Sequence, residues 1–545
     1  MSDTLREELE RVAGVLGAPG VPFVLERPRG EGHGDLATNL AMVLAGPLRS
    51  NPRVLAERVL QEMEVTRAMV TRTEIAGPGF INFWLSSDHL SNTIQEILTE
   101  GSAYGRSTIG MGQRVNVEFV SANPTGPLHV GHGRGAALGD GIASLLEWTG
   151  HDVTREFYIN DAGVQIGRVV ESLWARMRQA QGEDCPIPEG GYHGEYLIEA
   201  AERALMELPP ASIAPPFEAA APALREFVLR VQREEQDALL LDFGVRFDVY
   251  GSESAMYQAD RIATLLKELD DRGLTFEADG ALWLRTTDFG DDKDRVLRKS
   301  DGTYTYLMPD IVYHADKHDR GFDRAIDVWG ADHHGYIPRM RAALAALGYP
   351  PEFFEVAMVQ LVKVVKDGEE VRMSKRAGDL VTLRDLCDWV GADAARYFFL
   401  MRRGDTPFVF DVDLARARTE ENPVFYVQMA HARMSGIFRV ADIAPETVNG
   451  TLGVAALTAP EDTDLIKTLA LFPGFVERAA LGREPHRVTG YLEDLARQVH
   501  GWYHRCRVLG EPAPTEHARL MLARATRTVL ANGLTLLGLS APDRM

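Results

Sequence analysis

The stretch from Ser121 to Asp140 constrains the fold of this chain more than any other. It reads S-A-N-P-T-G-P-L-H-V-G-H-G-R-G-A-A-L-G-D and follows an alternating segment, residues 114–120, that predicts a strand. Apolar residues at helical spacing continue to Trp148, so the expected order is strand, Pro/Gly loop and helix. This order aims backbone N–H groups and the positive end of a helix dipole at an anion. We therefore expect a phosphate-binding site at the start of the helix.

Two histidines stand where the loop becomes the helix. One helical turn brings His129 and His132 to one side, and Gly131 and Gly133 let a ligand approach the backbone closely. The alternative is a surface turn whose histidines only cap the helix, the commoner meaning of an isolated pattern of this kind. The strand, loop and helix in this order favour the phosphate site.

Composition sets limits on the class of protein. The 545 residues are 45% hydrophobic and 25% charged, and this length predicts three or more domains. The three cysteines, Cys185, Cys387 and Cys506, form no C-x-x-C pair, which argues against a zinc ribbon or a disulfide framework and favours the cytoplasm. The charged N-terminus predicts no signal peptide, and no apolar run reaches membrane-spanning length. A net charge of −21 argues against indiscriminate nucleic-acid binding, although it permits a local basic face.

The order of predicted elements indicates a split nucleotide-binding fold. A strand at residues 151–159 completes a β-α-β unit, an irregular segment follows as an insertion, and we expect the parallel sheet to resume at residues 299–307. Asp310, after Pro309, would begin the next helix and could cap it. The expected domains are residues 1–108 (α+β), 109–165 (first half of the nucleotide fold), 166–290 (insertion), 291–370 (second half), 371–421 (clamp loop and helical junction) and 422–545 (all helix).

A second polar motif follows the buried strand at residues 326–330. It reads A-D-H-H-G-Y, and because ligands in open α/β sheets lie beyond the carboxyl ends of strands, Asp332 should face the same crevice as the histidine pair. A metal site is the alternative, but no partner cluster of ligands is evident. We expect Asp332 to accept ribose hydroxyls instead.

Further on, an apolar strand at residues 356–365 leads into V-R-M-S-K-R-A-G. A serine and two cations on a Gly-flanked loop after the last strand suit a clamp that closes on a triphosphate, and they point to Met373, Ser374 and Lys375. From residue 422 the pattern is nearly all helical. Its arginines suggest either a phosphate-facing surface or an ordinary solvated face: Arg433, Arg439, Arg497, Arg505 and Arg507.

Together these motifs resemble the class I aminoacyl-tRNA synthetases, and most closely the arginyl-tRNA synthetases. The resemblance covers essentially the whole chain. It is carried by E-F-V-S-A-N-P-T-G-P-L-H-V-G-H-G-R-G-A (118–136), F-Y-I-N-D-A-G (157–163), S-D-G-T-Y-T-Y (300–306), G-A-D-H-H-G-Y (330–336), R-M-S-K-R (372–376) and N-P-V-F-Y-V-Q-M-A-H-A-R (422–433).

The resemblance implies a fold and an activity. The fold is a split, doubly wound (Rossmann-like) parallel-sheet catalytic domain with an α+β N-terminal domain and an all-α C-terminal domain. The activity is ATP-dependent attachment of L-arginine to tRNA(Arg) through an arginyl-adenylate, with Mg²⁺ carried by ATP and no metal site made by protein alone. We expect a cytoplasmic monomer that binds neither membrane nor DNA.

The resemblance also assigns roles to single residues. Catalytic roles go to His129, His132, Ser374 and Lys375; ATP contacts to Gly131, Gly133, Asp332 and Met373; arginine contacts to Glu118, Ser121, Asn123, Tyr306 and Asp310; and tRNA contacts to Tyr426 and Arg433. The sequence departs from the family pattern at three positions. Arg372 stands where the clamp motif often begins with lysine, and Phe425 and Met429 stand where tyrosines are common.

Two other kinds of protein compete with this interpretation. Another nucleotidyl transferase with the same two-histidine loop would be shorter and would need no helical tail of this size. A synthetase-like binding protein without catalysis would show a broken histidine pair or a missing clamp lysine, whereas His129, His132 and Lys375 are all present.

Overall fold

The structure, a computed structural model, describes residues 2–26, 28, 33–65, 70–161, 164–254, 260–371, 381–450 and 453–545. The chain forms two compact units. One joins Met1–Ser107 to Phe425–Gly482 and Arg487–Met545, and the other contains Thr108–Val424 with Arg483–His486. No helix in the described ranges is long and apolar enough to cross a membrane.

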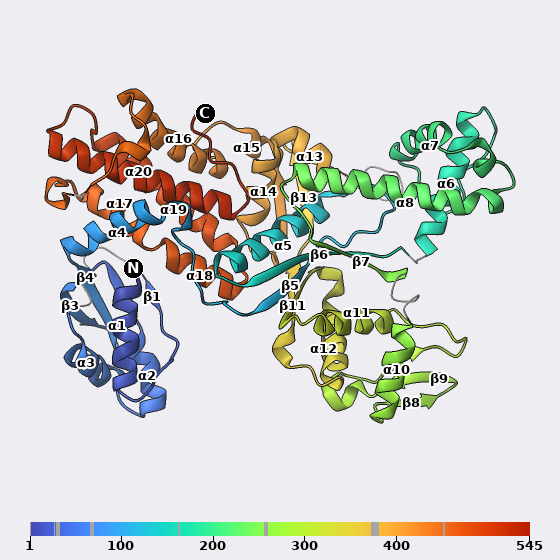
Figure 1. Ribbon diagram of the computed structural model, residues 1–545, viewed down its shortest axis with the longest axis horizontal. Coiled ribbons are helices and arrows are strands. Elements are labelled where there is room, and N and C mark those ends of the chain that lie inside the picture. Colours follow the sequence, from blue (N-terminus) through green and yellow to red (C-terminus); the bar gives the residue numbers. More distant parts are fainter. Residues whose placement is uncertain are drawn as a thin grey trace. The chain divides into compact units, whose positions relative to one another are not determined.

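A five-stranded parallel sheet forms the centre of the second unit (Figure 1). Its order is β12-β11-β5-β6-β7, and every neighbouring pair is parallel. The strands are β5 (Arg114–Glu118), β6 (Asp152–Ile159), β7 (Val249–Ser252), β11 (Arg324–Gly330) and β12 (Phe354–Val359). Helix α5 (Val130–Trp148) connects β5 to β6 and packs on the sheet, so the β-α-β unit is confirmed. The strand order reverses between β5 and β11, which is where such sheets bind ligands.

Three helices follow β6 and form a core of their own. They are α6 (Val164–Ala180), α7 (Tyr196–Glu207) and α8 (Phe217–Asp242). The chain then returns to the parallel sheet as β7, which pairs with β6. Residues 166–290 thus contribute an edge strand of the sheet as well as helices.

The expected strand at residues 299–307 is wrong. The parallel sheet resumes instead at β11, and the segment before it is an antiparallel sheet of β8 (Thr275–Ala278), β9 (Ala281–Leu284) and β10 (Arg295–Arg298). Tyr304 makes only an isolated bridge to Arg298, and helix α11 (Leu307–Asp319) begins at Leu307. Pro309 lies in the first turn of α11, where its missing N–H costs nothing. Asp310 is therefore inside the helix and does not cap it.

The single apolar strand expected at residues 356–365 is also wrong, because two strands of different sheets share this segment. Strand β12 ends at Val359, and the N–H of Gln360 donates to the carbonyl oxygen of Gly404. Strand β13 (Val362–Lys366) then pairs with β14 (Glu369–Glu370) and β15 (Phe408–Asp411). The other helices of this unit are α10 (Arg261–Asp271), α12 (Ile337–Ala346), α13 (Leu383–Val390), α14 (Ala392–Leu400) and α15 (Val412–Arg416).

The first unit contains an α+β part and a helical part, as expected. An antiparallel sheet, β1-β2-β4-β3, packs with helices around a core that includes Leu9, Leu44 and Phe83. The α+β elements are α1 (Ser2–Val15), β1 (Leu25–Glu26), β2 (Leu36–Thr38), α2 (Leu40–Leu48), α3 (Pro52–Glu62), β3 (Val70–Ala76), β4 (Phe80–Leu85) and α4 (Ser87–Glu100). The helical part is α16 (Pro423–Ala441), α17 (Pro460–Ala470), α18 (Phe472–Gly482), α19 (His486–Arg505) and α20 (Ala513–Leu536).

Helix α5 packs closely on the end of β5, and this contact gives a test of the fold. A Cβ at Gly139 would lie 2.2 Å from Cγ of the buried Phe119, whereas a Cβ at Gly135 would meet no atom within 4 Å. We expect Gly139→Ala to destabilise the unit by about 1–3 kcal/mol through overpacking. Gly135→Ala, the control one turn earlier, should be stabilising by about 0.5–1 kcal/mol. Thermal unfolding of the two variants checks this, and equal midpoints would contradict the packing.

Candidate active site

His129 and His132 lie at the first turn of α5, and their rings stack with centroids 3.7 Å apart and planes 18° apart. Nδ1 of His129 accepts hydrogen bonds from the backbone N–H groups of Gly131 and His132, at 3.0 and 3.3 Å. The backbone N–H of His129 donates in return to Nδ1 of His132, at 3.3 Å. The two histidines therefore do cap the helix.

Capping also determines the tautomer of both rings. Because each Nδ1 accepts a hydrogen bond from a backbone N–H, a neutral imidazole at either position carries its own proton on Nε2. Each ring is then an Nε2–H donor held in a defined orientation at the positive end of the helix dipole. The cap and the donor pair, which the sequence presents as alternatives, are thus compatible.

The two glycines of the loop have packing reasons that the sequence did not reveal. A Cβ on Gly133 would lie 2.6 Å from Cδ1 of Leu383, and one on Gly131 would lie 2.9 Å from Cε1 of His129. Side chains at these positions would push against α13 and against the capping ring.

Arg134, on the same helix, is almost completely buried and donates only to main-chain oxygens. Its guanidinium reaches the carbonyl oxygens of Gln360, Arg403 and Thr406, each at 2.9 Å. Burial lowers the pKa of Arg134 to about 10, which still leaves it charged at neutral pH. Arg134 therefore ties the start of α5 to the segments that lead into β13 and β15.

The turn after β5 is in an unusual backbone conformation. Val120 and Ser121 have φ angles of 67° and 41°, a region that side chains, β-branched ones above all, rarely adopt. The Ser121 hydroxyl donates to Oε1 of Glu118 at 2.9 Å and accepts from the N–H of Tyr158 at 3.1 Å. These two bonds hold the turn that leads to Asn123.

Glu118 belongs to a buried charge cluster that also contains His314, Lys317 and Asp327. Nζ of Lys317, which has no exposed surface, lies 2.6 Å from Oε2 of Glu118 and 2.9 Å from Oδ1 of Asp327. Burial opposes the charge of Lys317, but Asp327 and Glu118 outweigh it and hold the pKa of this ammonium above its usual range. Both oxygens of Glu118 are therefore already hydrogen-bonded within the protein.

His314 completes the cluster as a cation. Its Nδ1 faces the carbonyl oxygen of Asp310 at 2.7 Å, and its Nε2 faces Oδ2 of Asp327 at 2.8 Å. Because both oxygens are acceptors, both ring nitrogens carry protons. Burial opposes this charge too, but Asp327 outweighs burial and raises the pKa of His314. Burial would raise the pKa of Asp327, yet Lys317 and His314 lower it to about 2, so two cations face two carboxylates.

Two carboxylates, Asp310 and Asp161, lie close enough to Glu253 for their charges to act on it, near the carboxyl ends of β6 and β7. We call this group of three, the candidate site for a cation, the acidic pocket. Burial raises the pKa of Glu253, and the charges of Asp310 and Asp161 raise it further. Burial likewise raises the pKa of Asp310, although the Tyr336 hydroxyl, which donates to its Oδ2 at 2.6 Å, opposes this shift. A bound cation would relieve this concentration of like charge.

Sequence analysis missed Glu253. It directly follows β7, and the carboxyl end of a parallel strand is where a ligand contact is expected. The signal was hidden because β7 is only four residues long and lies in a segment interpreted as an irregular insertion.

Other predicted residues lie at the same edge of the sheet with fewer contacts. Asp332 is in the short helical turn after β11, and its side chain is 81% exposed. Tyr306 precedes the first residue of α11 and is 77% exposed, so it does not pack against Asp310. Nδ2 of Asn123 donates to Oε1 of Gln165 at 2.8 Å.

Met373, Ser374 and Lys375 lie outside the residues that the structure describes, as does Arg372. The chain that follows is hydrogen-bonded to the histidine loop. The N–H of Val130 donates to the carbonyl oxygen of Val381, and the N–H of Leu383 donates to that of Leu128. The described chain therefore resumes at Val381, next to the loop that carries His129.

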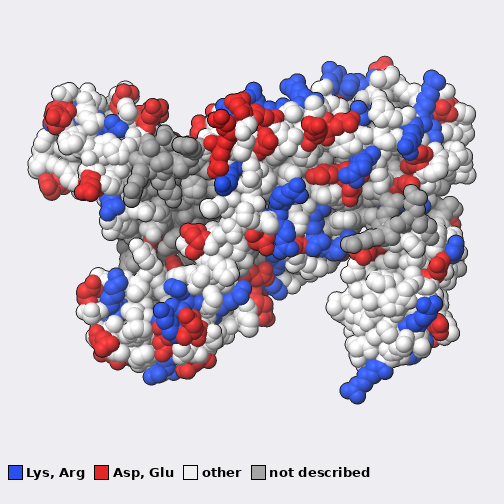
Figure 2. All heavy atoms as spheres, turned by 180° about the vertical axis from the view of Figure 1, so that it is seen from behind, with Lys and Arg blue, Asp and Glu red and all other residues white. Residues whose placement is uncertain are grey.

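In the helical part, Tyr426 and Arg433 both contact His500. The rings of Tyr426 and His500 are 4.3 Å apart, and Nη1 of Arg433 lies 2.6 Å from Nδ1 of His500. The other arginines that sequence analysis noted bond to nearby acids or carbonyl oxygens: Arg439 to Asp543, Arg497 to Asp494, Arg505 to Glu461 and Arg507 to Leu509. Across the face drawn in Figure 2, Lys and Arg side chains lie among Asp and Glu side chains.

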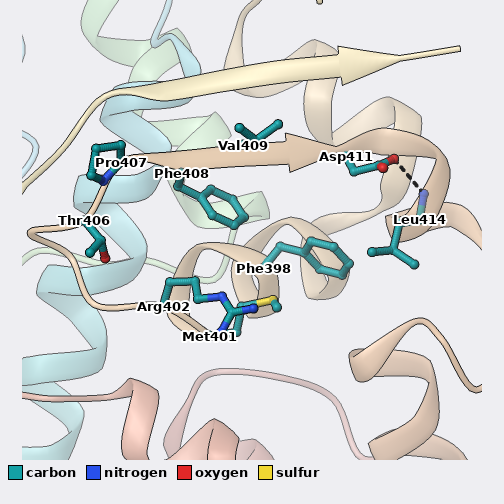
Figure 3. Close-up of a pocket in the computed structure, with 9 residues that line it drawn as sticks. All are labelled: Phe398, Met401, Arg402, Thr406, Pro407, Phe408, Val409, Asp411 and Leu414. Atoms are coloured by element: carbon teal, nitrogen blue, oxygen red, sulfur yellow. Dashed lines mark hydrogen bonds between the residues drawn. The ribbon is translucent and has the colours of Figure 1, made fainter. Parts of the chain in front are cut away.

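A cavity of about 460 Å³ lies between the end of α14 and β15. Figure 3 shows Phe398, Met401 and Phe408 among its lining residues, with the N–H of Leu414 donating to Asp411 at its edge. It contains none of the predicted site residues. Among the described residues, no group of three or more His, Cys, Asp and Glu side chains could hold a metal ion.

Comparison with known proteins identifies the family. Residues 93–399, more than half of the chain, match the family model described as "tRNA synthetases class I (R), catalytic domain". The chain belongs to the arginyl-tRNA synthetase family. Residues 1–85 match "Arginyl tRNA synthetase N terminal domain" and residues 427–545 match "DALR anticodon binding domain". The expected family and the expected fold class are therefore confirmed.

Similarity to known family members extends over the whole chain. The arginine–tRNA ligase of Geobacillus kaustophilus is 48% identical over 551 residues, covering 100% of this chain and 99% of that protein. That of Bacillus subtilis is 46% identical over 550 residues, with the same coverage. The solved structure of Thermus thermophilus arginyl-tRNA synthetase has a TM-score of 0.78 and 25% identity, and the match covers 99% of each chain.

The buried charge cluster yields a stability prediction. Lys317→Met leaves the carboxylates of Glu118 and Asp327 buried with less compensation, so we expect a loss of about 3–5 kcal/mol. The matched control is Lys363→Met, because Lys363 is 63% exposed and pairs with Glu370 at 3.2 Å. It should cost less than about 1 kcal/mol. The measurement is the unfolding midpoint in denaturant, and a Lys317 variant as stable as the control would refute the role of this ion pair.

Proposed function

We propose that this protein ligates L-arginine to tRNA(Arg) with ATP, through an arginyl-adenylate, and releases AMP and pyrophosphate. The observation that carries the proposal is the acidic pocket, where burial raises the pKa values of Glu253 and Asp310, and the charges of Asp310 and Asp161 raise that of Glu253 further. A guanidinium matches paired carboxylates in charge and in planar shape. The pocket lies at the carboxyl edge of the same sheet whose β5 leads into the histidine loop.

Arginine binds with its guanidinium at Asp310 and Glu253. Tyr336 orients Asp310 through its hydroxyl, and Tyr306 lies at the start of α11, the helix that carries Asp310. Asn123 contacts the α-amino group from the turn that Glu118 and Ser121 hold. Glu118 and Ser121 support this turn and do not contact arginine themselves, since Glu118 is bonded to both Lys317 and Ser121.

In the activation step, the arginine carboxylate attacks the α-phosphorus of ATP and pyrophosphate leaves. The Nε2–H groups of His129 and His132 donate to the phosphate oxygens as charge develops on them, with the start of α5 behind them. Gly131 and Gly133 keep this turn clear, and Asp332 binds the ribose. Ser374 and Lys375 close on the leaving pyrophosphate, with Met373 and Arg372 preceding them in the sequence. The described chain that follows them, from Val381, is hydrogen-bonded to the histidine loop.

The N-terminal and C-terminal parts of the chain bind the tRNA. Residues 422–545 bind the anticodon, with Tyr426 stacking on a base and Arg433 contacting phosphate, and residues 1–108 contact the body of the tRNA. Mg²⁺ is carried by ATP. The protein acts as a monomer in the cytoplasm and binds neither DNA nor membrane.

Exchange of labelled pyrophosphate into ATP tests the activity. We expect exchange that depends on arginine and appears with the purified protein only when tRNA(Arg) is added. Each of the other amino acids serves as a control in the same assay. Exchange driven by another amino acid, or no exchange with any tRNA, would contradict the proposal.

A substitution at His129 separates its two roles. Asparagine is among the best N-cap residues, so His129→Asn keeps the cap of α5 and removes the Nε2–H donor. We expect activation to slow by about 10²–10³-fold, the usual effect of losing one donor to a developing negative charge. The thermal midpoint and the affinity for tRNA should stay near those of the wild type. Parallel losses of stability and rate would show instead that the histidine acts only as a cap.

A further inference from the structure

The loop that carries Asn123 is held by side chains of the three helices that follow β6. The hydroxyl of Tyr196, at the start of α7, donates to the carbonyl oxygen of Thr125 at 2.6 Å. Nε2 of Gln236, on α8, donates to the carbonyl oxygens of Gly126 at 2.9 Å and Asn123 at 3.3 Å. Gln165 on α6 accepts from the Asn123 side chain, so each helix contributes one side chain.

These donors are well suited to hold a loop. Gln236 is 4% exposed, so water does not readily replace its amide as the hydrogen-bond donor to these carbonyl oxygens. Burial raises the pKa of Tyr196 above its usual range, which keeps its hydroxyl protonated as a donor. The approach is close, because a Cβ on Gly126 would lie 3.1 Å from the Tyr196 hydroxyl oxygen.

Apolar packing behind the loop is incomplete. A cavity of about 180 Å³ lies between the loop, β6 and α8, and Ala122, Pro124, Phe157 and Leu229 are among its lining residues. A side chain beside a cavity loses dispersion contacts on that side. The hydrogen bonds of Tyr196 and Gln236 therefore add to packing in holding residues 122–126.

We propose that Tyr196 and Gln236 are positioning residues for arginine: they hold the carbonyl oxygens of the Asn123–Gly126 loop and so place the Asn123 amide. This inference rests on the proposed function, in which Asn123 contacts the α-amino group of arginine. Neither residue touches the substrate. Their effect passes through the backbone of the loop into the geometry of the pocket.

The test removes each donor and compares it with a neighbour on the same helix. Tyr196→Phe loses only the hydroxyl, and Gln236→Leu loses the amide with little change of volume. Gln232→Leu is the control: Gln232 lies one turn earlier on α8, is fully buried, and neither of its side-chain polar atoms has a hydrogen-bond partner in the structure. In arginine-dependent pyrophosphate exchange with tRNA present, we expect kcat/KM for arginine to fall about tenfold in Tyr196→Phe and Gln236→Leu. KM for ATP and the affinity for tRNA should not change, and Gln232→Leu should stay within about twofold of wild type.

A double-mutant cycle separates positioning from general stability. If Tyr196 acts through Asn123, adding Tyr196→Phe to Asn123→Ala should change kcat/KM for arginine by less than about twofold. Full additivity of Tyr196→Phe and Asn123→Ala would overturn this inference but not the proposed function. Unchanged kinetics in both Tyr196→Phe and Gln236→Leu, with an active wild type, would do the same. A wild-type protein without arginine-dependent exchange would overturn the proposed function and this inference together.

Discussion

The ammonium group of Lys317 lies without solvent exposure between carboxylates of two neighbouring parallel strands, Glu118 on β5 and Asp327 on β11. Taking these charges out of water is costly, and only close pairing offsets that cost. The pairing therefore fixes where α11 lies against the sheet, at the point where the strand order reverses. The same helix carries Asp310 in its first turn, and His314 bonds to the backbone of Asp310. The position of the acidic pocket thus depends on the ion pair beneath it.

The charged side chains of this region form two groups that differ in how they are compensated. In the buried charge cluster, two cations match two carboxylates, and their hydrogen bonds are satisfied within the protein. In the acidic pocket no lysine or arginine of the described residues bonds to the carboxylate of Glu253 or Asp310, and burial raises both pKa values. A cationic substrate can therefore bind the pocket without competing with an internal lysine or arginine. Glu118, which the family resemblance suggests as a direct arginine contact, belongs instead to the buried charge cluster.

The sequence predicted the parts of the site whose contacts are local. The strand, loop and helix around His129 are confirmed, and so are the α+β and helical parts of the chain. Contacts between distant segments were not predictable. Lys317 meets Glu118 across 199 positions, and Gln236 meets Asn123 across 113. Short strands were not predictable for a related reason. Strand β7 has four residues, too few to show a periodic pattern, and it is a strand because it pairs with β6. Residues 299–307 were predicted to form a turn and a strand, but α11 already begins at Leu307, where Leu307 and Met308 are buried.

Arg134 recognises the backbone of its neighbours and not their side chains. Its three bonds end on the carbonyl oxygens of Gln360, Arg403 and Thr406, atoms that every amino acid supplies. The three partner positions are thus free to drift in evolution as long as the main chain keeps its course. Arg134 itself has no such freedom, because among side chains only a guanidinium presents enough donors in one plane to reach three oxygens. The side chain of Arg134 therefore joins α5 to these three positions. The side chains at the partner positions can differ between relatives without weakening that contact.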